Sequence, residues 1–143
     1  MTKEELISLI NDDLANELKH MLFYLHCSSA VRGLHREELS EMWLEHSQSE
    51  LKHVSEFSKV IVGLGGTPNT LRINGFPLMT DPQQQVEYAL AMEDEVVANY
   101  VQRLKDAEAL GGVDGKFVEL FIEDQIVDSR TDADHFREMV KQK

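Results

Sequence analysis

The sequence predicts an all-α protein built as a four-helix bundle, and three observations support this. Apolar residues recur with a period near 3.6 along four long stretches, which is the spacing of one face of an α-helix. The 143 residues include only eight Gly and three Pro, too few turn-forming residues for a protein of many short strands. With 42% hydrophobic and 28% charged residues, the chain has the composition of a folded protein and fits a single domain over residues 1–143.

The first two helices are predicted at about residues 2–32 and 36–62. Thr2, followed three residues later by Glu5, forms a capping-box pattern at the start of the first helix. Gly33 is the first helix breaker and separates the two stretches. A cluster of Gly, Thr, Pro and Asn after residue 63 ends the second helix.

The longest irregular segment, residues 64–80, is long enough to act as a crossover along the bundle. Asp81 and the proline after it then mark the start of a third helix that runs to Leu110. Two glycines end that helix, and a fourth is predicted at about residues 115–141. No fifth helix is expected. Helices of roughly 25 to 30 residues are about 40 Å long, a length typical of a bundle.

Charge and cysteine content exclude several classes of function. The 26 acidic residues outnumber the 14 Lys and Arg and give a net charge of −12, which repels nucleic acid and attracts divalent cations. A single cysteine, Cys27, rules out an internal disulfide and favours a reducing compartment. No apolar run is long enough to cross a bilayer, and the N-terminus lacks signal-peptide features. We therefore expect a cytoplasmic protein without nucleic-acid or membrane partners.

Four ionisable residues interrupt the apolar faces of three predicted helices. Glu17 lies on the first helix, Glu50 and His53 on the second, and Glu93 on the third. A buried carboxylate costs several kcal/mol unless it is paired, protonated or bound to a cation. Carboxylates together with imidazole suit iron, manganese or zinc. The pattern therefore predicts a metal site between the helices.

The ordinary alternative is that each of these residues lies at the edge of the core with its polar end in water. A Glu-x-x-His pair also occurs by chance, so its inward placement carries the argument. No Lys or Arg shares the inward positions, and we expect Lys52 and Arg103 to point elsewhere on their helices. A metal ion is then the simplest counter-charge.

The sequence resembles bacterioferritin and the wider ferritin-like family of di-iron carboxylate proteins. The resemblance covers most of the chain and is carried by four motifs: Asn16-Glu17-Leu18, Tyr24-Leu25-His26, Glu50-Leu51-Lys52-His53 and Leu90-Ala91-Met92-Glu93. It implies a ferritin-like bundle that binds iron and takes part in iron storage or handling. It also implies oxidation of Fe(II) by O2 or peroxide, a ferroxidase reaction, if two metal positions are filled.

The resemblance also implies a role for each matching residue. Glu17 and Glu93 would be terminal carboxylate ligands, Glu50 a bridging carboxylate and His53 a terminal imidazole. The same four residues would carry the chemistry if a di-metal centre assembles. Tyr24 resembles the family tyrosine beside the site.

The fourth predicted helix departs from the family pattern. Where the family has a second Glu-x-x-His, this chain has Ser129 and Asp132, so one metal position lacks its bridging carboxylate and its imidazole. His20, three residues after Glu17, and Asp132 are the strongest candidates to compensate. Asp128 and His135 are weaker candidates, and all four have ordinary alternative roles as core or surface residues.

Two further departures concern haem and assembly. Bacterioferritin uses a methionine directly after the bridging glutamate of the second helix to bind haem, and Leu51 stands there. We therefore expect no haem held in that way. The chain has no residues for the short fifth helix that ferritin cages use, so a closed shell is not expected. We do expect a homo-oligomer, either a dimer that pairs the first two helices or a larger assembly.

Three other functions stay open. The chain could be a metal-free or single-metal structural or interaction bundle that has lost ferroxidase activity. An oxidoreductase acting on an organic substrate ranks lower, because no substrate pocket is apparent. A role like that of the DNA-protecting mini-ferritins is also weak, since no basic tail is present.

Overall fold

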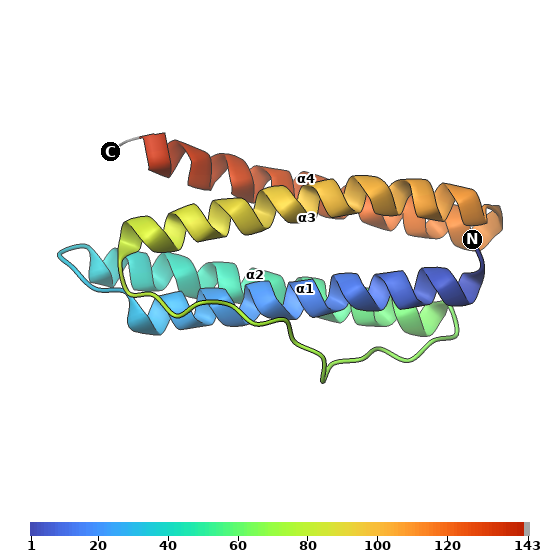
Figure 1. Cartoon of the computed structure of the whole chain (residues 1–143), viewed down its shortest axis with the longest axis horizontal. Helices are drawn as coiled ribbons and strands as arrows, with labels where there is room; N and C mark the ends of the chain where they lie inside the picture. Colours follow the sequence, from blue (N-terminus) through green and yellow to red (C-terminus); the bar gives the residue numbers. More distant parts are fainter. Residues whose placement is uncertain (142–143) are drawn as a thin grey trace. The chain divides into compact units, whose positions relative to one another are not determined.

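The structure, a computed structural model, describes residues 1–141 of the chain. This part of the chain forms four α-helices and no strands: α1 (Lys3–Ala30), α2 (Arg36–Gly63), α3 (Pro82–Leu110) and α4 (Gly112–Lys141) (Figure 1). The predicted all-α fold is confirmed, and every helix end lies within three residues of its predicted position. None of the helices in residues 1–141 combines the length and apolar content needed to cross a membrane.

Local capping contacts explain where α1 and α3 begin. The backbone N–H of Thr2 donates to the Glu5 carboxylate at 2.9 Å, and the N–H of Glu5 donates to the Thr2 hydroxyl at 3.1 Å. Before α3, the N–H of Gln84 donates to the Asp81 carboxylate at 3.0 Å. These bonds satisfy N–H groups that have no partner within the first helical turn. The two predicted helix starts are therefore confirmed.

The start of α4 differs from the prediction. The helix begins at Gly112 and not near residue 115, because Gly111 and Gly112 reverse the chain with φ angles of +71° and +66°. Glycine adopts such angles without strain. A Cβ atom at Gly115 would lie 2.5 Å from the carbonyl oxygen of Ala107, so the absence of a side chain allows α4 to start tightly against the end of α3.

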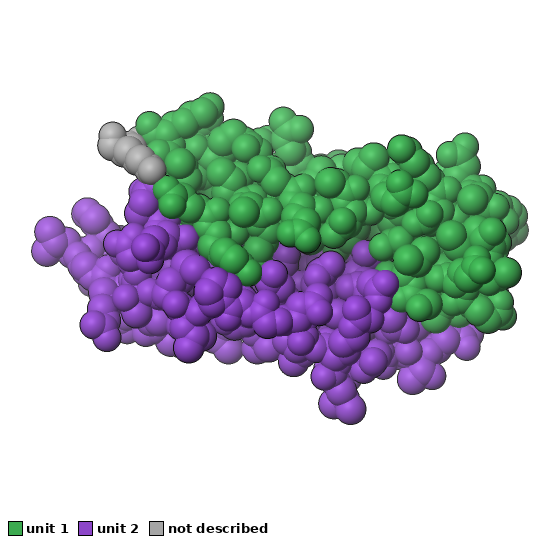
Figure 2. All heavy atoms as spheres, viewed as in Figure 1, with its two compact units in different colours: residues 1–9, 86–143 green, residues 10–85 purple. Residues whose placement is uncertain are grey.

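The chain divides into two compact units, each described here by itself (Figure 2). Unit 1 comprises Met1–Leu9 and Val86–Lys143, and unit 2 comprises Ile10–Gln85. Unit 2 contains most of α1, all of α2 and the segment that follows α2. Unit 1 contains α4 and most of α3.

In unit 2, α1 and α2 pack through large apolar side chains and a few small polar ones. The fully buried side chains of this unit include Leu14, Phe23, Tyr24, Trp43, Phe57 and Ile61. Near the α1–α2 turn, the hydroxyls of Ser28 and Ser40 each donate to the other residue's carbonyl at 2.7 Å. Further along, the Ser47 hydroxyl donates to the carbonyl of Met21 at 2.9 Å. These contacts fix the register of the two helices.

The predicted crossover, residues 64–81, runs alongside α1 within unit 2 (Figure 1). Side chains of α1 hold it in place. Asn11 bonds to the backbone of Thr67 and Asn69, Asn16 accepts from Asn74 at 2.7 Å, and His26 bonds to the backbone of Met79. An ion pair joins Asp12 to Arg72, and the rings of Phe23 and Phe76 meet edge-on.

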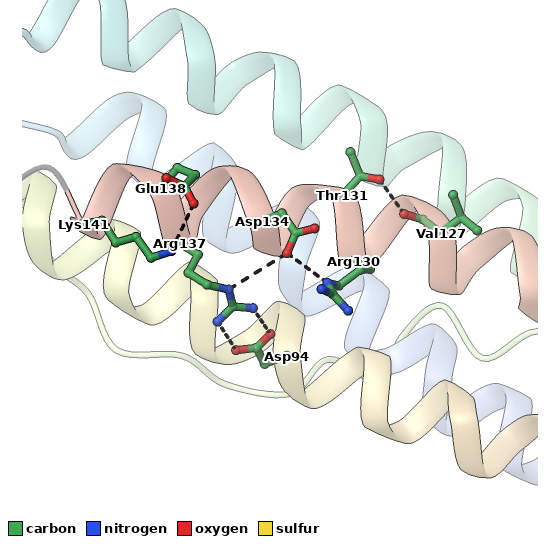
Figure 3. Close-up of polar contacts among 8 residues, drawn as sticks. All are labelled: Asp94, Val127, Arg130, Thr131, Asp134, Arg137, Glu138 and Lys141. Atoms are coloured by element: carbon green, nitrogen blue, oxygen red, sulfur yellow. Dashed lines mark hydrogen bonds and ion pairs between the residues drawn. The ribbon is translucent and has the colours of Figure 1, made fainter.

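In unit 1, α3 and α4 bury Val96, Tyr100, Val118, Ile122 and Phe136. On the surface, Arg137 of α4 binds Asp94 of α3 with two hydrogen bonds of 2.9 and 3.3 Å (Figure 3). Arg130 and Asp134 form a further ion pair along α4 at 2.9 Å. Exposed pairs of this kind contribute little stability each, and they orient the two helices.

Arg103 is expected to point away from the carboxylate positions of its helix, and it is nevertheless buried on α3, with 8% of the residue exposed. The Asp106 carboxylate lies 2.7 Å away and supplies the counter-charge that burial requires. Lys52 is exposed, as expected.

Candidate metal centre

Two helices of unit 2 place three ionisable side chains in the core. Glu17 follows the buried Leu14 by three residues on α1 and therefore shares its face. Glu50 and His53 lie three residues apart on α2. The exposed fractions of Glu17, Glu50 and His53 are 1%, 2% and 5%, so all three are buried as predicted.

These three side chains converge on one point. His53 Nδ1 lies 3.2 Å from Glu50 Oε2 and 3.5 Å from Glu17 Oε2. One oxygen or nitrogen from each residue falls within 4.8 Å of the others. The structure thus brings together three of the residues that the sequence singled out, from two helices.

Hydrogen bonding and charge shift the pKa of two members of this cluster. Burial raises the pKa of the Glu17 carboxyl group, but hydrogen bonds with Glu50 and His53 outweigh it. Aided by the charges of His20 and His53, they lower the pKa from 4.5 to about 2. Burial lowers the pKa of His53, but its bonds to the two carboxyl groups and their charges raise it from 6.5 to about 11.

These pKa shifts leave Glu17 and His53 with opposite charges at neutral pH. Glu17 is ionised and His53 is a cation. The His53 imidazolium, 3.5 Å from Glu17 and 3.2 Å from Glu50, therefore supplies a positive charge among these carboxyl groups in the absence of a metal.

Aromatic and imidazole rings of α1 and α2 contact one another in unit 2. The Tyr24 ring stacks on Trp43 with centroids 5.5 Å apart, and His46 lies 5.5 Å from Tyr24. His20 is 3% exposed and 6.1 Å from Tyr24. Trp43 is fully buried.

The remaining predicted residues belong to unit 1. Glu93 on α3 is fully buried, and Ser129 on α4 is 2% exposed, so both occupy inward positions as predicted. Asp132 is half-buried, whereas Asp128 and His135 are exposed. Exposure is the ordinary alternative for these last two residues.

The buried polar residues that were not singled out from the sequence include Asp13 and Gln125. Asp13 lies one turn before Glu17 on α1, and Gln125 one turn before Ser129 on α4, each 1% exposed. Gln125 follows the buried Ile122 by three residues. This spacing of three residues from an apolar position is the sequence signal that indicates an inward position for Gln125.

The geometry of the Glu17–Glu50–His53 cluster fits a divalent metal ion. Two atoms bound to one metal at about 2.1 Å lie about 3.0 to 3.4 Å apart when their bonds meet at tetrahedral or octahedral angles. The measured separations of 3.2 and 3.5 Å are close to these values. Two carboxylates and one imidazole form a donor set suited to iron, manganese or zinc.

A model of the ferritin-like domain family matches residues 7–142, nearly the whole chain. The chain belongs to this family. The resemblance found in the sequence is thereby confirmed, as is the ferritin-like four-helix bundle.

Solved structures share the fold of this ferritin-like chain. A ferritin-like, di-iron-carboxylate protein from Bacillus anthracis str. Ames is 27% identical, with a TM-score of 0.88 and 96% of each chain covered. Bacterioferritin BfrA from Mycobacterium tuberculosis is 20% identical, with a TM-score of 0.86 over 96% of this chain and 85% of that one.

Rhodobacter capsulatus bacterioferritin, whose structure has a metal-free dinuclear site and a haem iron, is 19% identical. Its TM-score is 0.86 over 97% of this chain and 85% of that one. Comparison with curated protein sequences gives no significant match.

Proposed function

We propose that this ferritin-like protein binds iron, or a related divalent metal, and serves in iron storage or handling. The observation that carries the proposal is the buried cluster of Glu17, Glu50 and His53, with His53 Nδ1 3.2 and 3.5 Å from the two carboxylates. Membership of the ferritin-like family supports iron as the metal. In this proposal residues 1–143 act as one domain, and the experiments below use the full chain.

The residues of the cluster have distinct tasks in this proposal. Glu17 supplies a carboxylate that is ionised at neutral pH, Glu50 supplies a second carboxyl group, and His53 supplies a nitrogen donor after it gives up a proton. The buried apolar neighbours exclude bulk water from the cluster. Glu93 and His20 are proposed as further ligands, because both side chains are buried and contain atoms that can bind a metal.

The same proposal expects weak or absent ferroxidase turnover. Ferroxidase chemistry uses two neighbouring metal positions that share the electrons taken by the oxidant. Ser129 replaces the carboxylate that the family pattern places on α4, and a serine hydroxyl is a poor ligand for iron. Asp132, three residues after Ser129, is half-buried and remains a candidate ligand.

Anaerobic loading with Fe(II), followed by elemental analysis, tests the proposal. We expect one tightly bound ion per chain, lost in Glu50→Ala and His53→Ala and retained in the matched control His135→Ala, whose imidazole is exposed. A Glu93→Ala variant reports whether that residue contributes to affinity. Equal metal content in the parent protein and the His53→Ala variant would contradict the proposal.

A metal-free structural role is the second candidate function. It is favoured by one observation, the ion pair by which the His53 cation already balances the ionised Glu17 at 3.5 Å. A ligand bound only by the native state raises stability. If the melting temperature of the purified protein is the same with chelator and with excess Fe(II), the structural role is favoured over metal binding.

A further inference from the structure

The crossover contains the sole Asn-Gly pair of the chain, Asn74–Gly75. Asn74 is half-buried and Gly75 is exposed, and neither belongs to a helix or to the metal centre. In an Asn-Gly pair the backbone nitrogen of the glycine can attack the side-chain amide carbon of the asparagine, because glycine has no Cβ atom to obstruct the approach. This reaction deamidates asparagine without an enzyme. The pair is therefore a candidate site of spontaneous modification.

The backbone at Gly75 is not held by a hydrogen bond. Among residues 1–141, the structure gives the Gly75 N–H no acceptor. A helical N–H, in contrast, is bonded to the carbonyl four residues earlier and cannot turn toward its neighbour's side chain. Asn11, Asn16 and Asn99 lie inside α1 or α3, and so do the residues that follow them. These three asparagines are therefore protected.

Asn69 is an internal comparison for Asn74. It lies in the same crossover and is exposed. Thr70 follows it, and the branched side chain of threonine obstructs attack by its backbone nitrogen. The Asn69 side-chain oxygen also accepts from the N–H of Leu71 at 3.2 Å. We therefore expect Asn69 to react more slowly than Asn74, although Asn69 is more exposed.

One contact restrains the Asn74 side chain in the folded protein. Its Nδ2 atom donates to Oδ1 of Asn16 on α1 at 2.7 Å. Nδ2 is the atom that would leave as ammonia, so this bond holds both the leaving group and the plane of the amide. Asn16 directly precedes Glu17, and the same bond therefore ties the crossover to α1 beside the metal centre (Figure 1).

We propose that Asn74 is a site of spontaneous deamidation, restrained by Asn16, and that the reaction loosens the crossover from α1. The Gly75 nitrogen gives its proton to water and forms a bond to Cγ of Asn74. The Cγ–Nδ2 bond breaks, and Nδ2 takes up a proton and leaves as ammonia. Water then opens the succinimide ring that results. Hydrolysis of the new Cγ–N bond gives aspartate, and hydrolysis of the original backbone C–N bond gives isoaspartate.

Both products change the contact with Asn16. A carboxylate has no N–H, so neither product can donate to the Asn16 oxygen as Asn74 does. Each product also adds one negative charge to a chain whose net charge is already −12. The bond between the crossover and α1 at this position is therefore lost or has to be rebuilt with the Asn16 amide turned over.

Isoaspartate has a further effect, because its main chain runs through the former side chain and is longer by one methylene. The crossover is anchored on both sides of position 74. Arg72 pairs with Asp12 of α1, and the Phe76 ring meets Phe23 of α1 edge-on. A longer main chain between these two anchors no longer fits the spacing of their partners on α1.

Peptide mass spectrometry of the full chain, aged at neutral pH and physiological temperature, tests the reaction. We expect conversion at Asn74, with isoaspartate among the products, while Asn69 stays largely intact. Gly75→Ala is the matched variant, because a Cβ atom at this position meets nothing within 4 Å and the glycine φ angle is not positive. This variant should slow the conversion about tenfold or more, equivalent to about 1.4 kcal/mol of added barrier. Circular dichroism should show it to be as helical as the parent protein.

Removal of the restraint tests the part played by α1. Asn16→Ala leaves the Asn74 amide without its acceptor and should speed the conversion at Asn74 several-fold. Conversion at Asn69, which has no contact with Asn16, should stay unchanged.

Hydrogen exchange measures the loosening of the crossover. The N–H groups of Asn69 and Met79 donate to Asn11 and His26 of α1 at 2.8 and 3.0 Å, so their exchange reports on the attachment of the crossover. Both should exchange several-fold faster in the aged protein than in the fresh one. Gly75→Ala protein aged in the same way should show no change.

Three results would each overturn the proposal. The first is an Asn74 that stays intact or converts no faster than Asn69. The second is an Asn16→Ala variant in which Asn74 converts at the parent rate. The third is an aged protein, converted at Asn74, whose crossover exchanges at the rate of the fresh protein. None of these measurements depends on bound metal, so they are made in chelator.

Discussion

Removal of the His53 imidazole is the sharpest perturbation of the buried cluster. In the metal-free protein at pH 7, the imidazolium balances the ionised Glu17 at 3.5 Å, and both residues are almost fully buried. His53→Ala leaves that carboxylate charged without a partner, or forces it to take up a proton. Breaking a buried ion pair from one side costs about 3 to 5 kcal/mol of unfolding free energy.

Urea denaturation in the presence of chelator measures this cost. A loss of this size corresponds to a fall in melting temperature of roughly 10 to 17 °C for a chain of this length. The matched control is His135→Ala, which removes an exposed imidazole from α4 and should change stability by less than about 0.5 kcal/mol. Glu17→Gln in the His53→Ala background should recover part of the loss, because it removes the unpaired charge.

A double-mutant cycle separates charge from packing. If the Glu17–His53 interaction has the proposed role, the coupling energy should be about 1 to 3 kcal/mol. A His53→Ala variant that loses less than about 1 kcal/mol, with additive effects in the cycle, would refute the reasoning.

Three further predictions follow from the same contacts. Metal binding at pH 7 should release about one proton per ion, because His53 has a pKa of about 11 and must become neutral to bind a metal. Calorimetry in buffers of different ionisation enthalpy counts the protons, and zero release would contradict the arrangement. Glu17 has a lower pKa in the folded protein, about 2, than its ordinary value of 4.5, so the stability it confers should be fully present above pH 4.5 and lost as the pH falls through about 2. Denaturation across this pH range should show the stability difference between the parent protein and Glu17→Gln shrinking as the pH falls. Thr2→Ala should lower the free energy of unfolding by about 1 kcal/mol, because it removes the cap of α1. An unchanged free energy of unfolding, measured by denaturation, would mean that the cap is redundant.

The helices were predictable because their signals are local. The Thr2–Glu5 cap, the Asp81 cap and the periodic apolar residues each act within a few positions of the chain, and the structure confirms them. The start of α4 was not predictable, because a pair of glycines indicates a break between helices but not the length of that break. Positive φ angles at Gly111 and Gly112 reverse the chain at once, and the helix resumes without a loop.

The members of the buried cluster could be singled out from the sequence, but the contacts between them could not. Glu17, Glu50 and His53 stand out because each interrupts an apolar face. Their contacts depend on the register of α1 against α2, to which distant contacts such as that of Ser47 with Met21 contribute. The approach of His53 to both carboxyl groups, and the pKa shifts that follow from it, could therefore be read only from the structure.

Arg103 shows the limit of residue type as a guide to burial. Arginine is usually exposed, and the sequence indicated only that Arg103 points away from the carboxylate positions of its helix. The Asp106 carboxylate one turn later makes burial acceptable, and that pairing requires a side-chain conformation that spacing alone does not determine.

The position of bound iron tests the central claim most directly. Crystals grown anaerobically with Fe(II) and measured at the iron absorption edge would give an anomalous difference map. The account predicts a peak within bonding distance of Glu17, Glu50 and His53, about 2.1 Å from a donor atom of each residue. A fully loaded crystal with no peak at these three side chains, or with its strongest peak elsewhere, would contradict it.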